Sequence, residues 1–146
     1  MHVNKLLVMG ALHLIIMFVL MYSMVNVVEN VYLNVNQLYM AAIMTAPMLM
    51  LEVLLMGSMY QNKTALKMIF GLSALALIIF FAFIRRQTFI DDKQFLWSMI
   101  PHHSGAILMC EKSKLTDTEL KELCVSIIEA QQSEIDQMKE ILNRLE

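Results

Sequence analysis

The chain has 146 residues, of which 58% are hydrophobic, and this composition is too apolar for an ordinary soluble domain and implies a membrane protein. Its net charge of −2, without any basic stripe, excludes a nucleic-acid-binding protein. Because most charged residues follow residue 84, we expect a membrane domain at 1–86 and a metal-binding helical hairpin domain at 87–146.

The membrane domain contains three apolar segments that are long enough to cross a bilayer as helices. We predict spans at about 6–28, 38–59 and 65–84, joined by short links, so that successive spans alternate in direction. Lys67 lies near one end of the third span and can extend its ammonium to the interface. Basic residues are equally frequent on the two sides, and the lysine-free first link favours an N-terminus inside and a hairpin domain outside.

Methionine is unusually frequent, with 15 residues, and several of these methionines form ridges on the first two spans. These ridges allow two interpretations: a relay of soft ligands for Cu(I), or the ordinary packing of helices along i, i+4 rows. A carboxylate within a span is costly, so we expect it to have a partner such as His13 or to be protonated. The candidate relay residues are His13, Met17, Met44, Met48 and the carboxylate Glu52.

The last part of the chain has the pattern of two amphipathic helices. Thr88 or Asp91 can cap a helix that runs to about Lys114, and Thr116 with Glu119 forms a capping box for a second helix. Two such helices bury little surface alone. We therefore predict an all-α protein in which two chains pair their hairpins into a four-helix bundle.

One face of the first hairpin helix carries soft metal ligands, namely Met99, His102, His103, Met109 and Cys110. If the turn lies near Leu115, they face residues of the second helix, among them Gln131, Glu134 and Met138. Imidazole and thioether together suit Cu(I) or Ag(I). The motifs of zinc hydrolases and of di-iron bundles are absent from the chain. The alternative is that both histidines are hydrogen-bonded packing residues.

Pro101 precedes the histidine pair inside the predicted helix. Its ring removes the hydrogen bond to the carbonyl of Trp97 and favours a kink. The kink either spreads the two imidazoles for ligand placement or bends the helix around a neighbour. Adjacent residues on a helix point about 100° apart, so one histidine can serve its own hairpin and the other a partner chain.

The two cysteines, Cys110 and Cys124, lie close to the predicted register of the hairpin. Three states remain open for them: a disulfide across the hairpin, a pair of thiolate ligands, or buried free thiols.

The segments MIPHHSGAI (99–107) and ELKELCVSIIEAQQSEIDQMKEIL (119–142) resemble the family catalogued as domain of unknown function 305. Its pattern is M-x-x-HH-x-x-AI followed by II-x-x-Q-x-x-EI-x-x-M. The resemblance implies a ferritin-like bundle outside the cytoplasmic membrane of bacteria, with copper and silver binding described for some members. The family pattern falls on Met99, His102, His103, Gln131, Glu134 and Met138, whereas Met109 and Cys110 lie where it has no fixed residue.

These observations predict a multi-pass protein of a bacterial cytoplasmic membrane whose hairpin, on the periplasmic side, binds Cu(I) or Ag(I) for sequestration or handling. No nucleophile with a base and no phosphate-binding glycine loop is present, so we do not expect an enzyme. The expected partners are membrane lipid and a second copy of the chain. Two alternatives are a structural or interaction module whose histidines pack a dimer interface, and a transport subunit that uses the methionine ridges.

Overall fold

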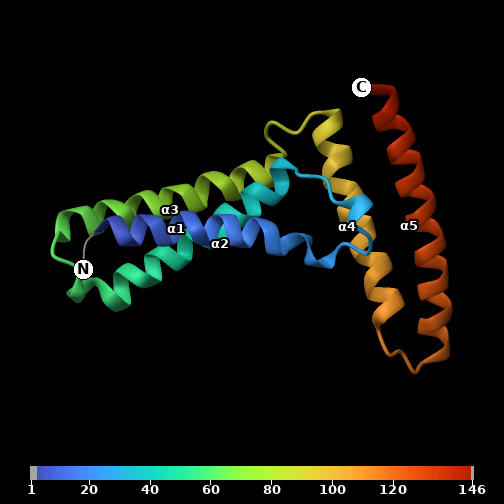
Figure 1. Ribbon diagram of the computed structural model, residues 1–146, viewed down its shortest axis with the longest axis horizontal. Helices are drawn as coiled ribbons and strands as arrows, with labels where there is room; N and C mark the ends of the chain where they lie inside the picture. The colour runs from blue at the N-terminus through green and yellow to red at the C-terminus, as the bar shows by residue number, and fades with distance from the viewer. Residues whose placement is uncertain (1–2, 146) are drawn as a thin grey trace. The chain divides into compact units, whose positions relative to one another are not determined.

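A computed structural model describes residues 3–145, and within this range every regular element is a helix (Figure 1). The chain divides into two compact units. The membrane unit comprises Met1–Met21 and Asn36–Phe89, and the hairpin unit comprises Tyr22–Val35 and Ile90–Glu146. The long helices are α1 (Val3–Leu20), α2 (Val35–Met56), α3 (Lys63–Arg86), α4 (Asp92–Lys112) and α5 (Thr118–Leu145), and the short 3-10 helices are η1 (Met21–Met24), η2 (Val28–Asn30) and η3 (Gly57–Met59).

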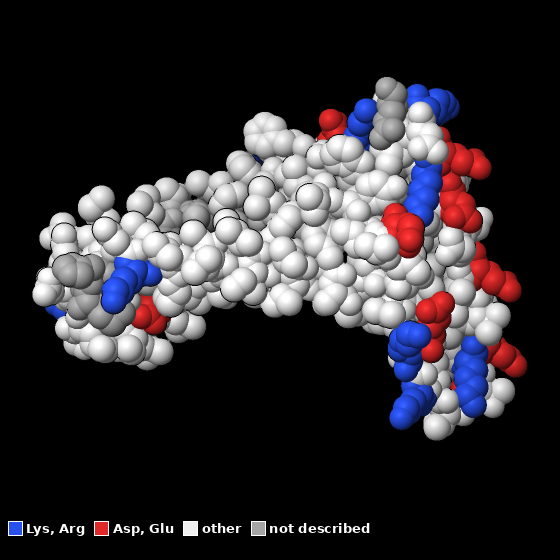
Figure 2. Space-filling view, viewed as in Figure 1, with Lys and Arg blue, Asp and Glu red and all other residues white. Residues whose placement is uncertain are grey.

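Within the described residues, three helical segments are long and apolar enough to cross a membrane: Val3–Met24, Val35–Met59 and Lys63–Arg86. Three candidate spans were predicted, and three are found. Most of their apolar side chains are exposed, as the side chains of helices surrounded by lipid would be. Figure 2 shows few charged residues over the spans except at one end, whereas α4 and α5 carry both signs of charge.

The spans share a buried cluster near one end of the membrane unit. Leu6, Tyr60 and Leu66 form a buried cluster there, joined by Val53 and other partly buried residues. α3 begins at a cap in which the Asn62 side chain accepts a hydrogen bond from the backbone N–H of Ala65. These contacts fix the end of α2 against the start of α3.

The hairpin unit is built on one apolar cluster between α4 and α5. The buried members of this cluster are Leu96, Ile100, Ile107, Ile135, Met138 and Leu142. Asp91, one of the two caps considered for this helix, caps α4 by accepting a hydrogen bond from the N–H of Gln94. The cap predicted at Thr116 is wrong: Asp117 accepts the bond from the N–H of Leu120, so α5 begins one residue after it.

The first span ends earlier than predicted. Residues 22–35, here called the strap, belong to the hairpin unit, and the candidate span ends within them at Met24. Tyr32 of the strap packs against the α4–α5 cluster. The strap lies beside α4 in Figure 1 and bonds to it through asparagine side chains. Positions 25–28 thus leave the predicted span, because the chain needs them to reach α4.

Candidate metal site on the helical hairpin

His103 of α4 contacts Glu134 of α5 across the hairpin. Nε2 of His103 lies 3.4 Å from Oε2 of Glu134, and Nε2 of Gln131 is also 3.4 Å from that oxygen. The His103 side chain is 14% exposed and the Glu134 side chain is 52% exposed. Three of the residues predicted for the metal site are therefore brought together.

The surroundings of His103 favour its neutral form. Burial lowers the pKa of the imidazole, the carboxylate of Glu134 acts in the opposite direction, and neighbouring His102 lowers the pKa further. Nδ1 of the ring is buried and has no hydrogen-bond partner among residues 3–145. A neutral imidazole with an unused buried nitrogen is the form that can ligate a metal.

The second histidine has different surroundings. His102 is exposed, and its ring centroid lies 6.0 Å from that of His103, with the ring planes at 66°. The two side chains leave the helix in different directions, and it is His103 that contacts α5.

The predicted thioether ligands are distributed over two environments. Met138 is buried in the α4–α5 cluster, and Met99 packs against the same cluster. Met109 is 53% exposed and lies on the outer side of the helix. Within residues 3–145, no group of three or more His, Cys, Asp or Glu side chains is placed to hold a metal ion. The His, Cys, Asp and Glu side chains of this part of a single chain therefore do not form a complete metal site.

Cys110 and Cys124 form a disulfide between α4 and α5, with Cα atoms 5.3 Å apart. Three states had been left open for these cysteines, and the structure has the disulfide in place of free thiols or thiolate ligands. The prediction that Cys110 is a metal ligand is wrong for this oxidised chain, because a bridged sulfur has no thiolate to offer.

Pro101 has a clear structural consequence. The carbonyl of Trp97, which loses its helical partner at Pro101, accepts a hydrogen bond of 3.1 Å from Nδ2 of Asn34 in the strap. The same amide nitrogen also donates to the carbonyl of Tyr32. This arrangement favours the interpretation that the proline accommodates a neighbour, and that neighbour is the strap.

The SG dipeptide of the histidine motif also contacts the strap. Oγ of Ser104 accepts a hydrogen bond of 2.8 Å from the backbone N–H of Asn26 and bonds to the Asn26 side chain. Gly105 lies close to the strap, since a Cβ atom at this position would be in van der Waals contact with the carbonyl oxygen of Met24 at 3.4 Å. These roles were not predicted from the sequence, although the many asparagines between the first two spans were a signal.

Two of the candidate relay residues of the spans, His13 and Glu52, have hydrogen-bond partners. Nδ1 of His13 lies 3.1 Å from Oγ1 of Thr45, and the Tyr60 hydroxyl donates to Glu52 at 2.9 Å. The suggested partnership of Glu52 with His13 is therefore wrong, because both have other partners. Of the relay methionines, Met17 and Met48 are partly buried and Met44 is 41% exposed.

A family model described as Domain of unknown function (DUF305) matches residues 84–142, a range that includes the His103–Glu134 contact and the disulfide. A relative from Acanthamoeba polyphaga mimivirus, "Uncharacterized protein L153", is 37% identical over 120 residues, which are 81% of this chain and 77% of the relative. The chain belongs to the DUF305 family. No solved structure matches this DUF305 protein. Since this relative is viral, the expectation of a bacterial membrane stays a prediction.

Proposed function

We propose that this DUF305 protein is a membrane-anchored binder of a soft monovalent cation, Cu(I) or Ag(I), which it sequesters or hands on. The observation that carries the proposal is the largely buried imidazole of His103, whose Nδ1 has no hydrogen-bond partner in the part of the chain that the structure describes. A buried polar atom without a partner calls for an explanation, and a bound ion is one of the few available.

The donors of the hairpin suit such an ion. His103 would bind through an imidazole nitrogen, and the thioethers of Met99 and Met138 belong to the cluster between the same two helices. Nitrogen and thioether sulfur are the donors that favour Cu(I) over Mg²⁺ or Ca²⁺. Glu134 and Gln131 would orient His103, since the neighbours of a metal-binding histidine fix its ring.

We also propose that two hairpins pair. One chain supplies few donors, whereas a second hairpin would bring its own set and complete a four-helix bundle. The exposed His102 is available to a partner chain, as expected for neighbouring histidines that leave the helix in different directions.

The disulfide bears on the location of the hairpin. Cytoplasmic thiols are kept reduced, so a bridge between α4 and α5 favours a hairpin outside the cytoplasm. This agrees with the orientation that the lysine-free first link favours.

A second function, a structural or interaction module, is favoured by a specific set of contacts. Pro101, Ser104 and Gly105 are all engaged with the strap, so much of the histidine motif already serves the fold. In that case His103 and Glu134 would form only an ion pair or hydrogen bond between helices.

A competition experiment separates the two functions. The detergent-solubilised full-length protein is titrated with Cu(I) in the presence of a chromogenic Cu(I) chelator, with the disulfide intact. Metal binding predicts that His103→Ala abolishes tight binding and that Glu134→Gln weakens it by roughly 10- to 100-fold. Gln132→Ala is the matched control, because the Gln132 side chain is exposed on α5 and bonds to Asp136 of the same helix. An affinity that is negligible in the unaltered protein, or unchanged in His103→Ala, would favour the structural module.

A further inference from the structure

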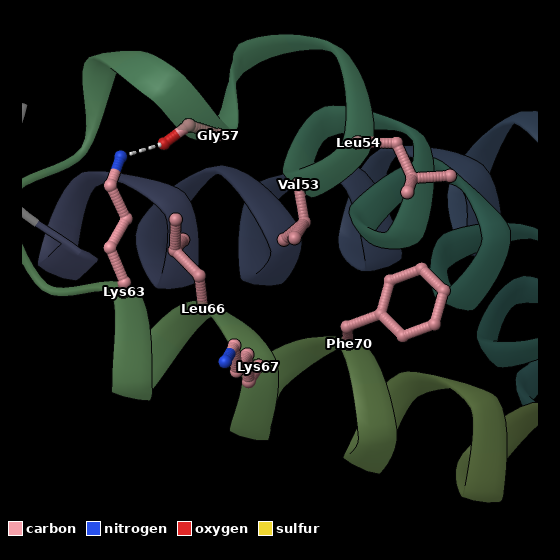
Figure 3. A pocket seen from close by; sticks show the side chains of 7 residues that line it. All are labelled: Val53, Leu54, Gly57, Lys63, Leu66, Lys67 and Phe70. Carbon is pink, nitrogen blue, oxygen red and sulfur yellow. Dashed lines mark hydrogen bonds between the residues drawn. The ribbon is translucent and has the colours of Figure 1, made fainter.

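A pocket of about 410 Å³ lies in the membrane unit between the end of α2 and the start of α3 (Figure 3). It is lined by Val53, Leu54, Gly57, Lys63, Leu66, Lys67 and Phe70. Its volume is in the range of pockets that hold small ligands. The pocket belongs to neither the hairpin nor the proposed metal site.

The walls of the pocket are apolar. Val53 and Leu54 come from α2, and Leu66 and Phe70 come from α3, with the Phe70 ring extending toward α2 in Figure 3. Leu66 is buried and belongs to the cluster with Leu6 and Tyr60, so this wall is held in place by the packing of the spans. Such walls suit a hydrocarbon chain and provide no hydrogen bonds for a polar ligand.

Two lysines stand at the same pocket. Nζ of Lys63 donates to the carbonyl of Gly57 at 2.6 Å and to that of Ser58 at 3.2 Å, which leaves one of its three protons. Lys67, one turn further along α3, is exposed and has no hydrogen bond or ion pair to any residue of the described range. The pocket thus combines an apolar wall with a cation that has no partner among residues 3–145.

The position of the pocket in the spans matches the level of lipid headgroups. It adjoins η3, the turn where the chain leaves α2 and re-enters the membrane as α3. The acid in this region, Glu52, accepts a hydrogen bond from Tyr60. Basic pockets between spans at this level attract anionic headgroups.

We propose that this pocket binds an anionic phospholipid of the bilayer. One acyl chain lies against Val53, Leu54, Leu66 and Phe70, and the phosphate accepts hydrogen bonds from Lys67 and from the remaining proton of Lys63. A free phosphate would use the lysines but leave the apolar walls empty, so the lipid is the occupant that the whole pocket fits.

Lipid retention by the full-length protein tests this proposal. The protein is delipidated in mild detergent, incubated with equal amounts of phosphatidylglycerol and phosphatidylcholine of identical chains, and examined by native mass spectrometry. We expect preferential retention of phosphatidylglycerol. Lys67→Gln should reduce this preference about fivefold, the factor for one lysine near an anionic surface. Leu54→Trp, which narrows the pocket without changing charge, should reduce the retention of both lipids.

Lys5→Gln is the matched control, because Lys5 is an exposed lysine in the first turn of α1 that does not line the pocket. An equal loss in Lys5→Gln and Lys67→Gln would show general surface attraction and overturn the proposal. Equal retention of both lipids by the unaltered protein would overturn it as well, and so would complete displacement of the lipid by soluble glycerol phosphate. Circular dichroism of each variant shows that the spans are still folded.

Discussion

At the scale of single residues, Asn34 supplies the hydrogen bond that Pro101 cannot give. A proline inside a helix leaves the carbonyl four residues earlier without its usual donor, and an unpaired carbonyl away from water costs about 1–3 kcal/mol. The amide of Asn34 reaches the carbonyl of Trp97 and removes this cost. The proline therefore creates an acceptor on α4 that holds the strap.

This pairing predicts a coupling between two positions. Asn34→Ala should lower the free energy of unfolding by about 1–3 kcal/mol, because the carbonyl of Trp97 loses its donor. Pro101→Ala restores a backbone N–H at position 101, so it should be less harmful, or even stabilising, when Asn34 is already alanine. A double-mutant cycle by denaturant unfolding of the detergent-solubilised protein measures the coupling, and strictly additive effects would contradict it.

His103 predicts a pH dependence in the metal-free protein. Its pKa in the folded chain is lowered from the ordinary value of 6.5, mainly by burial, against the opposing effect of Glu134. As the pH falls from 6.5 toward the folded pKa, the unfolded chain binds the proton first, so folding loses stability. Above pH 6.5 both states are neutral and this contribution is constant.

Unfolding at about pH 7.5 and about pH 5.5 in the presence of a chelator measures this effect. His103→Gln should lose less stability on acidification than the unaltered protein. His102→Gln is the control, because His102 is exposed. Equal acid sensitivity of the unaltered protein and His103→Gln would show that other groups determine the pH dependence.

At the scale of elements, the hairpin is held by an apolar cluster and a covalent bridge. Ile100, Ile107 and Ile135 are at most 1% exposed between α4 and α5, and the disulfide joins the helices near their connecting turn. Two helices of this length have limited surface to bury, so the bridge adds to a small core.

Removal of the bridge should be costly. A disulfide that closes a loop of this size stabilises by roughly 3 kcal/mol, mainly by restricting the unfolded chain. We expect the double variant Cys110→Ser, Cys124→Ser to lose about this much, and we expect reductant to destabilise the unaltered protein but not the variant. Thermal unfolding with and without reductant checks both. A reductant effect on the double variant would point to a cause other than this bridge.

The buried isoleucines give a second prediction for the hairpin. Ile135→Ala should cost about 2–5 kcal/mol, since it leaves a cavity in a closely packed cluster. Leu123→Ala is the matched control on the same helix, where the side chain is 53% exposed, and should cost much less. Denaturant unfolding measures both variants. Similar midpoints for the two would show that Ile135 does not lie in the core of the hairpin.

The helices themselves could be predicted from sequence because long apolar runs and capping residues are local signals. α4, for example, begins at the predicted cap Asp91. The strap could not be predicted, because its contacts join residues such as Asn26 and Ser104, which are far apart in the chain. The sequence identified His103 and Glu134 as candidates. It did not show that Met109 faces outward or which state the cysteines adopt, because these features depend on contacts between the two helices.

At the scale of the whole molecule, the chain crosses between its two units more than once. The hairpin unit takes residues 22–35 from between the first two spans and 90–146 from after the third. A fragment that begins near Phe89 would therefore lack the strap, which is part of the hairpin unit. Metal affinities are better measured on the full-length protein.

The proposed orientation gives a prediction at this scale. If the hairpin lies outside the cytoplasm, a reporter enzyme that needs an oxidising compartment should be active when fused to the C-terminus. In this orientation the turn between α2 and α3 lies inside, so the same reporter placed in that turn should be inactive. An inactive C-terminal fusion beside an active turn fusion would reverse the orientation.

The place of the strap in the chain also has a consequence for biosynthesis. The ribosome completes Asn26 and Asn34 long before Ser104 and Trp97, the residues that they bond. During this interval the asparagine side chains of the strap cannot make these bonds, because the third span and α4 are still being made. The hairpin unit can therefore close on the strap only after Ser104 has been made.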